Sequence, residues 1–592
     1  MRILFLTHSF NSLTQRLYVE LTERGHDVSI EFDINDTVTI EAVRLFQPDV
    51  IIAPYLRRAI PEQIWRQHVC LVVHPGVVGD RGPSALDWAI LREETEWGVI
   101  VLQATGEMDA GPIWAAVNFP MRLSRKSSLY HNEVTEATVV AVLQAIEQFA
   151  RGDFVPESLH VKGSNVRGAW RPQMSQSDRC IDWSADDTRA VLRKIHSADG
   201  SPGVEDTLFG DLYHLYDACE EDILRGTPGE IIARRDGAIC RATRDGAVWI
   251  GHLKRIIQGE KTFKLPATMV LHDKLQYVPE IALAPESLLD RRTYKEIWYD
   301  EKAGVGYLHF DFYNGAMNTD QCQRLREAYL QACQRPTRVI VLMGGPDFWS
   351  NGLHLNCIEA ASSPADESWR NINAMDDLAH AIITTETHLT VAALRGNTAA
   401  GGVFLALAAD QIYAREGIVL NPHYKNMGNL YGSEYWTYLL PKRAGTSGAR
   451  EIMENRLPIG TLSAKRAGLV DDSLGMNVDE FVSKVESIAE ALASDTSYAA
   501  QLKAKRQQQA HDEAIKPLSV YRAEELERMK LNFYGFDPSY HVARYNFVFK
   551  ISHSWTPLHL AKHRRRVKDD YRFGDNARNR AGVAASAPVP TA

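Results

Sequence analysis

Hydrophobic runs and amphipathic segments alternate along the first 150 residues of the chain. The runs "RILFLTHSF", "DVSIEFD" and "DVIIAPY" predict buried strands, and "SLTQRLYVELTERG" and "TIEAVRLFQ" between them predict helices. This alternation is typical of a parallel sheet with helices on both faces. We therefore expect an α/β domain over residues 1–165. Its first loop lacks G-x-G-x-x-G, which disfavours a dinucleotide there.

A different pattern follows the Gly-, Pro- and Arg-rich residues 151–172. Two "RDGA" turns separate short alternating runs and predict hairpins, which indicates a small β domain over residues 173–272. The runs "AGVGYLHFDF" and "TRVIVLMGG" then predict a second α/β domain over residues 285–540. For residues 541–592 we expect a helix and a disordered tail, "RNRAGVAASAPVPTA". The predicted class is a multidomain α/β protein.

Composition excludes several classes of function. The net charge of −9 argues against nucleic acid or an anionic membrane as a partner. No run reaches the ~18 apolar residues of a membrane span. The apolar run in the first ten residues is too short for the hydrophobic region of a signal sequence, so we expect a cytoplasmic chain. The seven cysteines form no C-x-x-C pair, which predicts reduced thiols and no structural metal.

The stretch "LVVHPGVVGDRGP" carries the first candidate chemistry. A hydrophobic run presents His74 on a loop, where open sheets place their ligand crevices, and "MDAGPIW" supplies Asp109 before a Gly-Pro turn. A His and a carboxylate at neighbouring strand ends are able to act as an oriented acid–base pair. A His that is merely hydrogen-bonded in the core shows the same local pattern.

These two motifs, in this order, resemble the formyltransferases that use 10-formyltetrahydrofolate, over about residues 1–270. The resemblance implies a Rossmann-like catalytic domain followed by a small β-barrel domain. It also implies that His74 and Asp109 support attack on the formyl group, and that Arg81 and Gly82 lie in the folate-binding loop. The expected cofactor is 10-formyltetrahydrofolate.

The chain departs from that family at Val72, which stands where the family has an Asn two residues before the His. Loss of one such hydrogen-bond donor costs ~10²–10³ in rate. Either the domain is a weak relic, or its acceptor is a better nucleophile than an amine. A thiol meets that requirement, because a thiolate is strongly nucleophilic and forms near neutral pH.

The third region contains "WSNGLHL" and "AAGGVFLALAAD", in the order seen in the enoyl-CoA hydratase/isomerase (crotonase) family. The resemblance covers about residues 295–490 and implies a crotonase fold that binds coenzyme A, with C-terminal helices after it. The backbone N–H groups of Asn351 and Gly401 are then expected to hold a thioester oxygen. A Gly-rich turn that opens a buried helix explains "AAGG" by itself, but the later Asp410 and "LSAKRAGLVDD" follow at the family's intervals.

Both glutamates of the crotonase family are absent, because Phe404 and Tyr424 occupy their positions. Without two carboxylates to activate water, hydration of a double bond is not expected. Tyr424 and Glu434, in "NPHYKNMGNLYGSEYW", are the residues we expect to move a proton. Packing is the alternative role for so Tyr-rich a segment.

A folate-dependent formyltransferase fused to a crotonase resembles a family of hydrogenase maturation proteins. That resemblance implies synthesis of carbon monoxide for NiFe hydrogenase: formyl passes from 10-formyltetrahydrofolate to coenzyme A, and formyl-CoA then yields CO. The implied partners are the hydrogenase large-subunit precursor or the machinery that assembles its Fe(CN)2CO group. Two alternatives remain: an amine formyltransferase regulated by acyl-CoA, or a non-catalytic maturation scaffold.

Three late histidines, His553, His559 and His563, lie at loose helical spacing. A metal site and a solvated or domain-covering helix both fit this spacing, and we favour the solvated or domain-covering helix. The neighbouring run "HRRRVK" is expected to lie on the surface, with coenzyme A phosphates as an alternative contact.

Overall fold

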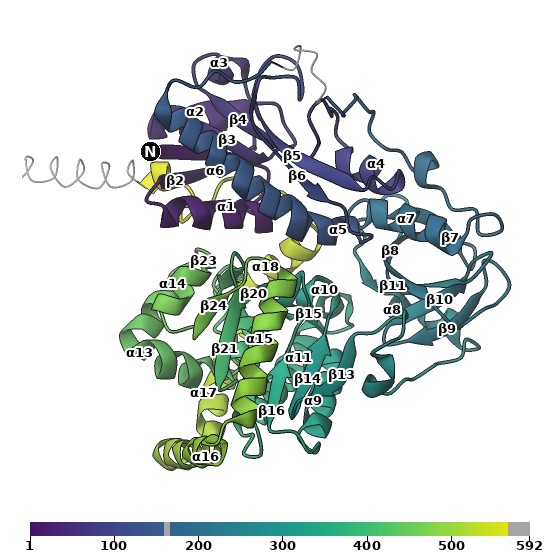
Figure 1. Ribbon diagram of the computed structural model, residues 1–592, viewed down its shortest axis with the longest axis vertical. Helices are drawn as coiled ribbons and strands as arrows, with labels where there is room; N and C mark the ends of the chain where they lie inside the picture. Colours follow the sequence, from purple (N-terminus) through teal and green to yellow (C-terminus); the bar gives the residue numbers. More distant parts are fainter. Residues whose placement is uncertain (159–165, 566–592) are drawn as a thin grey trace, which may run out of the picture.

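The computed structural model describes residues 1–158 and 166–565. In Figure 1 the first domain lies at the top, the β domain at the right and the crotonase-like region below. No helix within these described ranges is long and apolar enough to cross a membrane.

The first domain is a six-stranded sheet with the order β2-β1-β3-β4-β5-β6. Strands β1 to β4 pair in parallel, as the alternating pattern predicts, whereas β5 and β6 are antiparallel. The three strands named from the sequence are parallel as expected, and the sheet continues with two antiparallel strands that the pattern did not predict. A loop joins β5 to β6, and parallel pairing would have required a longer crossover. The strands are β1 (Arg2–Thr7), β2 (Asp27–Phe32), β3 (Val50–Tyr55), β4 (Cys70–His74), β5 (Glu96–Gln103) and β6 (Ile113–Pro120).

Helices cover both faces of this sheet, and their apolar sides pack into two separate clusters. Asn11 caps the first helix by accepting a hydrogen bond from the Thr14 N–H at 3.0 Å. The helical segments are α1 (Ser12–Glu23), α2 (Asp36–Phe46), α3 (Glu62–Trp65), α4 (Ala85–Leu91), α5 (Lys126–Leu129), the π-helix η1 (Tyr130–Val134) and α6 (Thr135–Arg151).

The β domain is a six-stranded antiparallel sheet, and both predicted hairpins are confirmed. Asp236 and Gly237 turn the first hairpin with φ of 48° and 87°, as a tight two-residue turn requires. The path β7-β8-β11-β10-β9, with β12 on β11, has β7 and β9 at its two ends, so we describe a sheet and not a closed barrel. Its elements are η2 (Ser177–Arg179), α7 (Thr188–Ala198), β7 (Val204–Leu208), β8 (Asp211–Glu221), β9 (Ile231–Arg235), β10 (Ala238–Ala242), β11 (Ala247–Arg255), β12 (Leu265–Pro266), α8 (Ala267–Leu271) and η3 (His272–Leu275).

The crotonase-like region contains a six-stranded sheet, β13-β14-β16-β19-β21-β24, and a four-stranded sheet, β17-β20-β22-β23. A third pair, β15 and β18, is parallel. The strands are β13 (Ile297–Lys302), β14 (Val305–Phe310), β15 (Ala316–Met317), β16 (Val339–Leu342), β17 (Phe348–Ser350), β18 (Gly352–Leu353), β19 (Leu389–Leu394), β20 (Asn397–Ala399), β21 (Gln411–Arg415), β22 (Val419–Asn421), β23 (Ile459–Gly460) and β24 (Asp472–Leu474).

Helices surround these sheets, and the largest apolar core of the described residues forms between them. They are η4 (Pro285–Leu288), η5 (Tyr313–Gly315), α9 (Thr319–Ala332), α10 (Leu355–Ala360), α11 (Pro364–Ile383), α12 (Gly401–Leu407), α13 (Trp436–Glu454), α14 (Thr461–Arg466), α15 (Val478–Ser494), α16 (Tyr498–Ile515), α17 (Leu518–Tyr534) and α18 (Ser539–Val548).

After α18 the chain returns to the first domain and lies along the edge strand β2. The Ile30 N–H donates to the Leu560 carbonyl at 3.1 Å. His563 is buried between Ser29 and Glu31, at 2.8 and 2.9 Å from its two ring nitrogens. Of the two alternatives left open, a solvated or a domain-covering helix, the structure shows the covering role, although most of the segment is irregular and not helical. The predicted disordered tail lies outside the described residues.

Candidate active sites

Strand β4 ends at His74, whose imidazole is buried between two carboxylates. Nε2 lies 2.9 Å from Oδ2 of Asp80, and Nδ1 lies 3.6 Å from Oδ2 of Asp109. An ionised carboxylate only accepts hydrogen bonds, so the imidazole donates from Nε2 to Asp80. Nδ1 faces Asp109 across a gap that is too long for a hydrogen bond. The structure thus brings the two residues predicted from sequence together, with Nδ1 available for a proton.

Asp80 is a site residue that the sequence reasoning missed. It is 1% exposed, and its other oxygen accepts from Nη1 of Arg171 at 2.9 Å. A Cβ on Gly76 would lie 2.6 Å from Nε2 of His74 and 2.7 Å from the Asp80 carboxylate, so this turn requires glycine. Asp80 is part of the motif "HPGVVGDRGP", but its contact with His74 depends on the fold of the loop between them.

Arg81 and Gly82, predicted to bind folate, lie on the loop beside this pair. The Gly82 N–H donates to the Asp109 carboxylate at 3.2 Å, and Gly82 has a φ of 116° that favours glycine. Nη1 of Arg81 donates to Glu107 at 2.6 Å. Residues 166–172 cross this loop and pair with it through backbone hydrogen bonds. Gly82 therefore supports Asp109, and Arg81 lies at the outer rim.

Val72 shares the His74 face of β4, because alternate residues of a strand point the same way. Its side chain is half-buried and packs against an apolar cluster that includes Leu6 and Ala53. The position that holds an amide in the formyltransferase family is therefore apolar.

In the crotonase-like region, the predicted oxyanion donor Asn351 needs correction. Its N–H already donates to the Gly315 carbonyl at 2.6 Å, through the pairing of β15 with β18. Gly352, one residue later, lies against Gly401, the other predicted donor. A Cβ added to Gly352 would lie 3.3 Å from the Gly401 nitrogen. Gly401 begins α12, where the first N–H groups have no partner within the helix. Gly352 and Gly401 thus lie together, but the Gly352 N–H donates to the Ser350 hydroxyl oxygen at 3.2 Å, which leaves the Gly401 N–H as the candidate donor.

Tyr424 and Glu434 also meet, beside the start of α12. The Tyr424 hydroxyl donates to Oε2 of Glu434 at 2.5 Å, and Phe404 stacks on the Tyr424 ring with centroids 5.2 Å apart. The two side chains at the family's glutamate positions are therefore in contact. A Cβ added to Gly401 would lie only 2.1 Å from Oε1 of Glu434, so the Glu434 carboxyl lies directly against Gly401.

Burial determines the protonation of this pair. Burial, followed by the nearby Asp376 carboxylate, raises the pKa of Glu434 to about 8, and burial raises the pKa of Tyr424 well above its usual value. At neutral pH, Glu434 is mostly protonated and Tyr424 is a phenol. The pair thus holds exchangeable protons next to the Gly401 N–H, which has no partner within its helix, and both side chains are buried.

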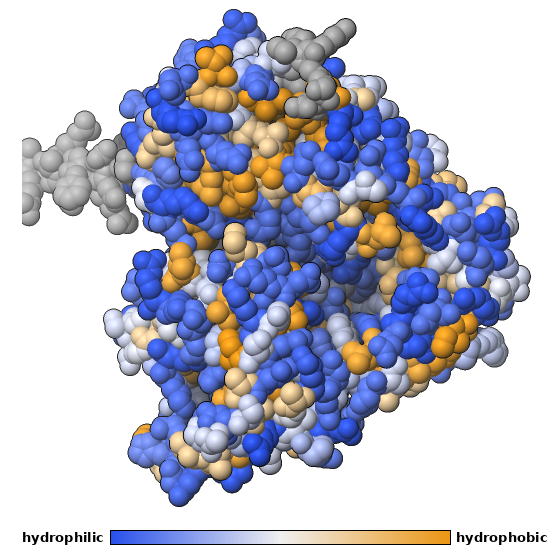
Figure 2. Space-filling view, viewed as in Figure 1, coloured by the Kyte–Doolittle hydropathy of each residue, from blue (hydrophilic) through white to orange (hydrophobic). Residues whose placement is uncertain are grey.

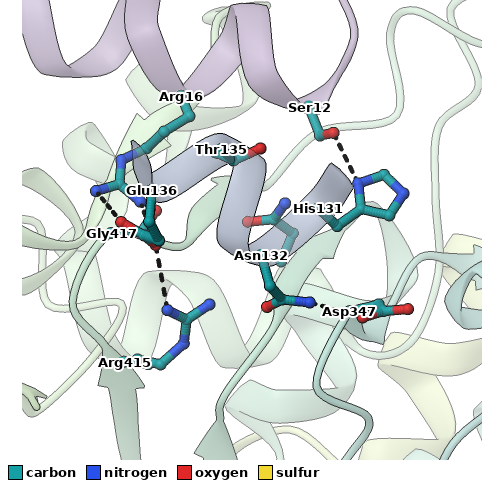
Figure 3. A pocket seen from close by; sticks show the side chains of 10 residues that line it. Ser12, Arg16, His131, Asn132, Thr135, Glu136, Asp347, Arg415 and Gly417 are labelled. Carbon is teal, nitrogen blue, oxygen red and sulfur yellow. Dashed lines mark hydrogen bonds and ion pairs between the residues drawn. The ribbon is translucent and has the colours of Figure 1, made fainter. Parts of the chain in front are cut away.

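The first domain and the crotonase-like region meet at an interface that contains a cavity of about 10 Å³, near the size of one water (Figure 3). Glu136 pairs with Arg16 at 3.2 Å and with Arg415 at 3.3 Å. The ring of His131, in the π-helix η1, packs on Phe348 of β17 with centroids 4.8 Å apart. The first domain therefore contacts the strand that leads into Gly352.

Further polar contacts join all three domains. Arg125 of the first domain pairs with Asp217 of the β domain and lies 3.6 Å from Asp347 of the crotonase-like region. Figure 2 shows the surface hollowed where the domains meet, with mainly hydrophilic side chains around the hollow. Such a hydrophilic junction suits a polar substrate that passes between domains.

Comparisons with known proteins agree with this arrangement. Family models match in three places: formyl transferase over residues 31–146, the formyl transferase C-terminal domain over 173–266 and enoyl-CoA hydratase/isomerase over 300–528. Methionyl-tRNA formyltransferase from Geotalea uraniireducens is 22% identical over 225 residues, 38% of this chain and 69% of that protein. Both resemblances inferred from the motifs are confirmed.

Two proteins match almost the whole chain. "Hydrogenase maturation factor HoxX" from Bradyrhizobium diazoefficiens is 56% identical over 564 residues, 95% of this chain and 97% of that protein. The crystal structure of HypX from Aquifex aeolicus in complex with tetrahydrofolic acid is 50% identical, with a TM-score of 0.92, and covers 95% of this chain and 99% of that one.

Proposed function

Because this chain belongs to the HoxX/HypX family of hydrogenase maturation factors, we propose that it makes carbon monoxide for the NiFe-hydrogenase active site. The first domain transfers formyl from 10-formyltetrahydrofolate to coenzyme A, and the crotonase-like region splits formyl-CoA into CO and coenzyme A. The observation that carries this proposal is the buried Tyr424–Glu434 pair beside the start of α12.

In the first step the coenzyme A thiol gives its proton to Nδ1 of His74, and its sulfur attacks the formyl carbon. The bond between that carbon and the folate nitrogen breaks, and the nitrogen takes the proton from His74. Asp80 holds the imidazole by its other nitrogen, and Asp109 stabilises the imidazolium. Val72 supports a thiol acceptor, because a thiolate needs less hydrogen-bonding assistance than an amine.

In the second step the ionised Glu434 takes the formyl proton. The electron pair of the C–H bond stays on carbon as the lone pair of CO, and the C–S bond breaks toward sulfur. The thiolate then takes a proton from Glu434 or through Tyr424, so formyl-CoA yields CO and coenzyme A without an oxidant. The N–H group of Gly401, at the start of α12, positions the formyl oxygen.

Two neighbouring lysines, half-buried Lys264 and exposed Lys550, support binding of an anionic substrate. Burial lowers the pKa of Lys264 to about 8 and also lowers that of Lys550. Lys550 further lowers the pKa of Lys264, so the two charges repel. The Lys264 ammonium donates to the Gly200 carbonyl and to the Tyr313 hydroxyl, each at 3.1 Å, which fixes its position. A phosphate-bearing substrate such as coenzyme A would neutralise both.

The recipient of CO in this proposal is the hydrogenase large-subunit precursor or the machinery that assembles its Fe(CN)2CO group, in the cytoplasm. The test is to incubate the purified chain with 10-formyltetrahydrofolate and coenzyme A and to measure CO with a haem protein. Omission of coenzyme A should abolish CO. Formyl transfer to amines in place of CO would favour the regulated amine formyltransferase, and no turnover of the folate would favour a scaffold.

A further inference from the structure

A buried cluster of three carboxyl groups surrounds the turn that carries Glu434. Asp376 comes from α11, Glu525 comes from α17, and both are at most 1% exposed, as is Glu434. Asp376 lies 58 residues before Glu434 in the sequence, and Glu525 lies 91 residues after it, so only the fold brings the three groups together. Only Glu434 has a role in the proposed reaction, so the other two need an explanation.

The turn has an unusual backbone. Glu434 and Tyr435 both have a φ of 59°, in the left-handed region that side chains with a Cβ disfavour. Two such residues in succession persist only where surrounding contacts hold them. This conformation sends the Glu434 carboxyl toward Gly401 while Tyr435 begins the approach to α13.

Asp376 and Glu525 supply those contacts. Oδ1 of Asp376 accepts the Glu434 N–H at 2.8 Å, and its other oxygen accepts the Ser433 hydroxyl at 2.8 Å. Oε2 of Glu525 accepts the Tyr435 N–H at 3.0 Å, and Oε1 accepts the Thr437 N–H at 2.8 Å. Three backbone N–H groups of residues 433–437 therefore depend on these two carboxyl groups.

Resting on the CO-releasing role proposed above for Glu434, we propose that Asp376 and Glu525 are positioning residues of that site. They hold residues 433–437 in the left-handed turn that directs the Glu434 carboxyl at Gly401. Helix α17, which follows the catalytic segment by more than eighty residues, thereby completes the site.

The charges around Glu434 give Asp376 a second effect. The Asp376 carboxylate raises the pKa of Glu434, and Glu525 acts in the same direction. Arg522 of α17 is the nearby cation, with Nε 3.7 Å from the Asp376 carboxylate. The titratable or charged groups that face Glu434 are, by element, Asp376 on α11, Glu525 and Arg522 on α17, Cys322 on α9 and Tyr424 after β22.

Two substitutions separate position from charge. Asp376→Asn keeps one oxygen for the Glu434 N–H, and the Ser433 hydroxyl is able to accept from the new amide, so the turn is retained while the charge is lost. Glu525→Gln has one carbonyl oxygen for two backbone N–H groups, so one of them loses its acceptor. Glu524→Gln, on the same helix at an exposed position, is the matched control.

The experiment measures the rate at which the full chain releases CO from added formyl-CoA. The pH is varied over a range that spans the pKa of Glu434, about 8. Glu525→Gln should lower kcat by about 10², the effect of misplacing a catalytic group by about 1 Å, with little change in KM. Glu525→Asp, which keeps two oxygens, should recover part of that loss. Asp376→Asn should move the rise of rate with pH roughly one pH unit lower, because a like charge is removed.

Formyl transfer from 10-formyltetrahydrofolate reports folding in the same molecules and should be unchanged in every variant. Loss of that activity in Glu525→Gln would mean misfolding, and Asp376→Asn then decides the question. If both variants keep the kcat and the pH profile of the parent, the positioning role is wrong. If the parent itself releases no CO from formyl-CoA, the proposed function fails, and this inference fails with it.

Discussion

The two candidate sites depart from their families in opposite ways. The first retains its ionisable pair, His74 and Asp109, and has lost a neutral amide at Val72. The second has lost both ionisable groups of its family, at Phe404 and Tyr424, and a carboxyl group reappears on a different segment at Glu434. Under the proposed function, the first change concerns what accepts the formyl group, and the second concerns what the acid–base group acts upon.

The surroundings of the two proton carriers differ as well. His74 is held between the carboxylates of Asp80 and Asp109. Glu434 is buried among other carboxyl groups, and its pKa is raised to about 8. An imidazole held between carboxylates suits formyl transfer, whereas a water-excluded carboxylate base with a raised pKa suits the splitting of formyl-CoA without hydrolysis.

The largest effect is expected from His74→Ala, which removes the imidazole from the first site. Formyl transfer should fall by about 10⁴, the upper end of the range for general acid–base catalysis. Release of CO from added formyl-CoA should stay at the parent rate, because that chemistry takes place in another domain. Folate absorbance measures the first activity, and a haem assay measures the second. Parent-like deformylation by this variant, or by Asp109→Asn, would contradict the assignment.

The reciprocal change is Glu434→Gln or Tyr424→Phe in the second site. Each keeps the shape of its side chain and removes a proton-transfer group, so CO release should fall by ~10²–10⁴. Formyl transfer should continue, and formyl-CoA should accumulate or hydrolyse slowly to formate. Mass spectrometry of the quenched mixture detects both products. Parent-rate CO from both variants would show that the proton moves by another route.

Asp80→Asn tests the residue that the sequence reasoning missed. The amide is able to present its NH2 to the imidazole, which would leave Nε2 as the acceptor and Nδ1 with the proton. Formyl transfer should therefore fall by roughly 10², because the atom that receives the thiol proton is then already protonated. Asp153→Asn, an exposed change after α6 in the same domain, is the control. Equal rates in the two variants would remove Asp80 from the site.

The pH dependence should separate the two sites without any mutation. Glu434 acts as a base only when ionised, and burial and Asp376 raise its pKa to about 8. CO release from formyl-CoA should therefore rise about tenfold between about pH 7 and about pH 9, since the ionised fraction rises by that factor. A rate that falls over this interval would assign Glu434 the opposite role, that of an acid.

The smallest effect is expected from Val72→Asn, which restores the family's amide. If the acceptor is a thiol, CO output from 10-formyltetrahydrofolate should not rise, and it could fall slightly because a polar group enters an apolar position. The comparison uses initial rates at saturating substrates, with formylation of amines measured in parallel. A tenfold increase in CO would identify the first site as a degraded amine formyltransferase.

Much of the fold and part of each site could be predicted from local patterns. The alternation of strands and helices located β1 to β3, and the "RDGA" turns located the hairpins, because periodicity and turn chemistry act over a few residues. The motif order identified both domain families. The directions of β5 and β6 were missed, because direction depends on how a connecting loop packs and not on strand composition.

The sequence by itself determined which residue types are available for proton transfer: His74, Asp109, Tyr424 and Glu434 all lie in motifs that are read locally. Tertiary structure alone decided which partners they have. A folded loop brings Asp80 to His74, strand pairing engages Asn351 and leaves Gly352 beside Gly401, and α11 and α17 deliver Asp376 and Glu525 to Glu434. Such contacts join distant segments through packing and burial, which also raise the pKa of Glu434, and no local period encodes them.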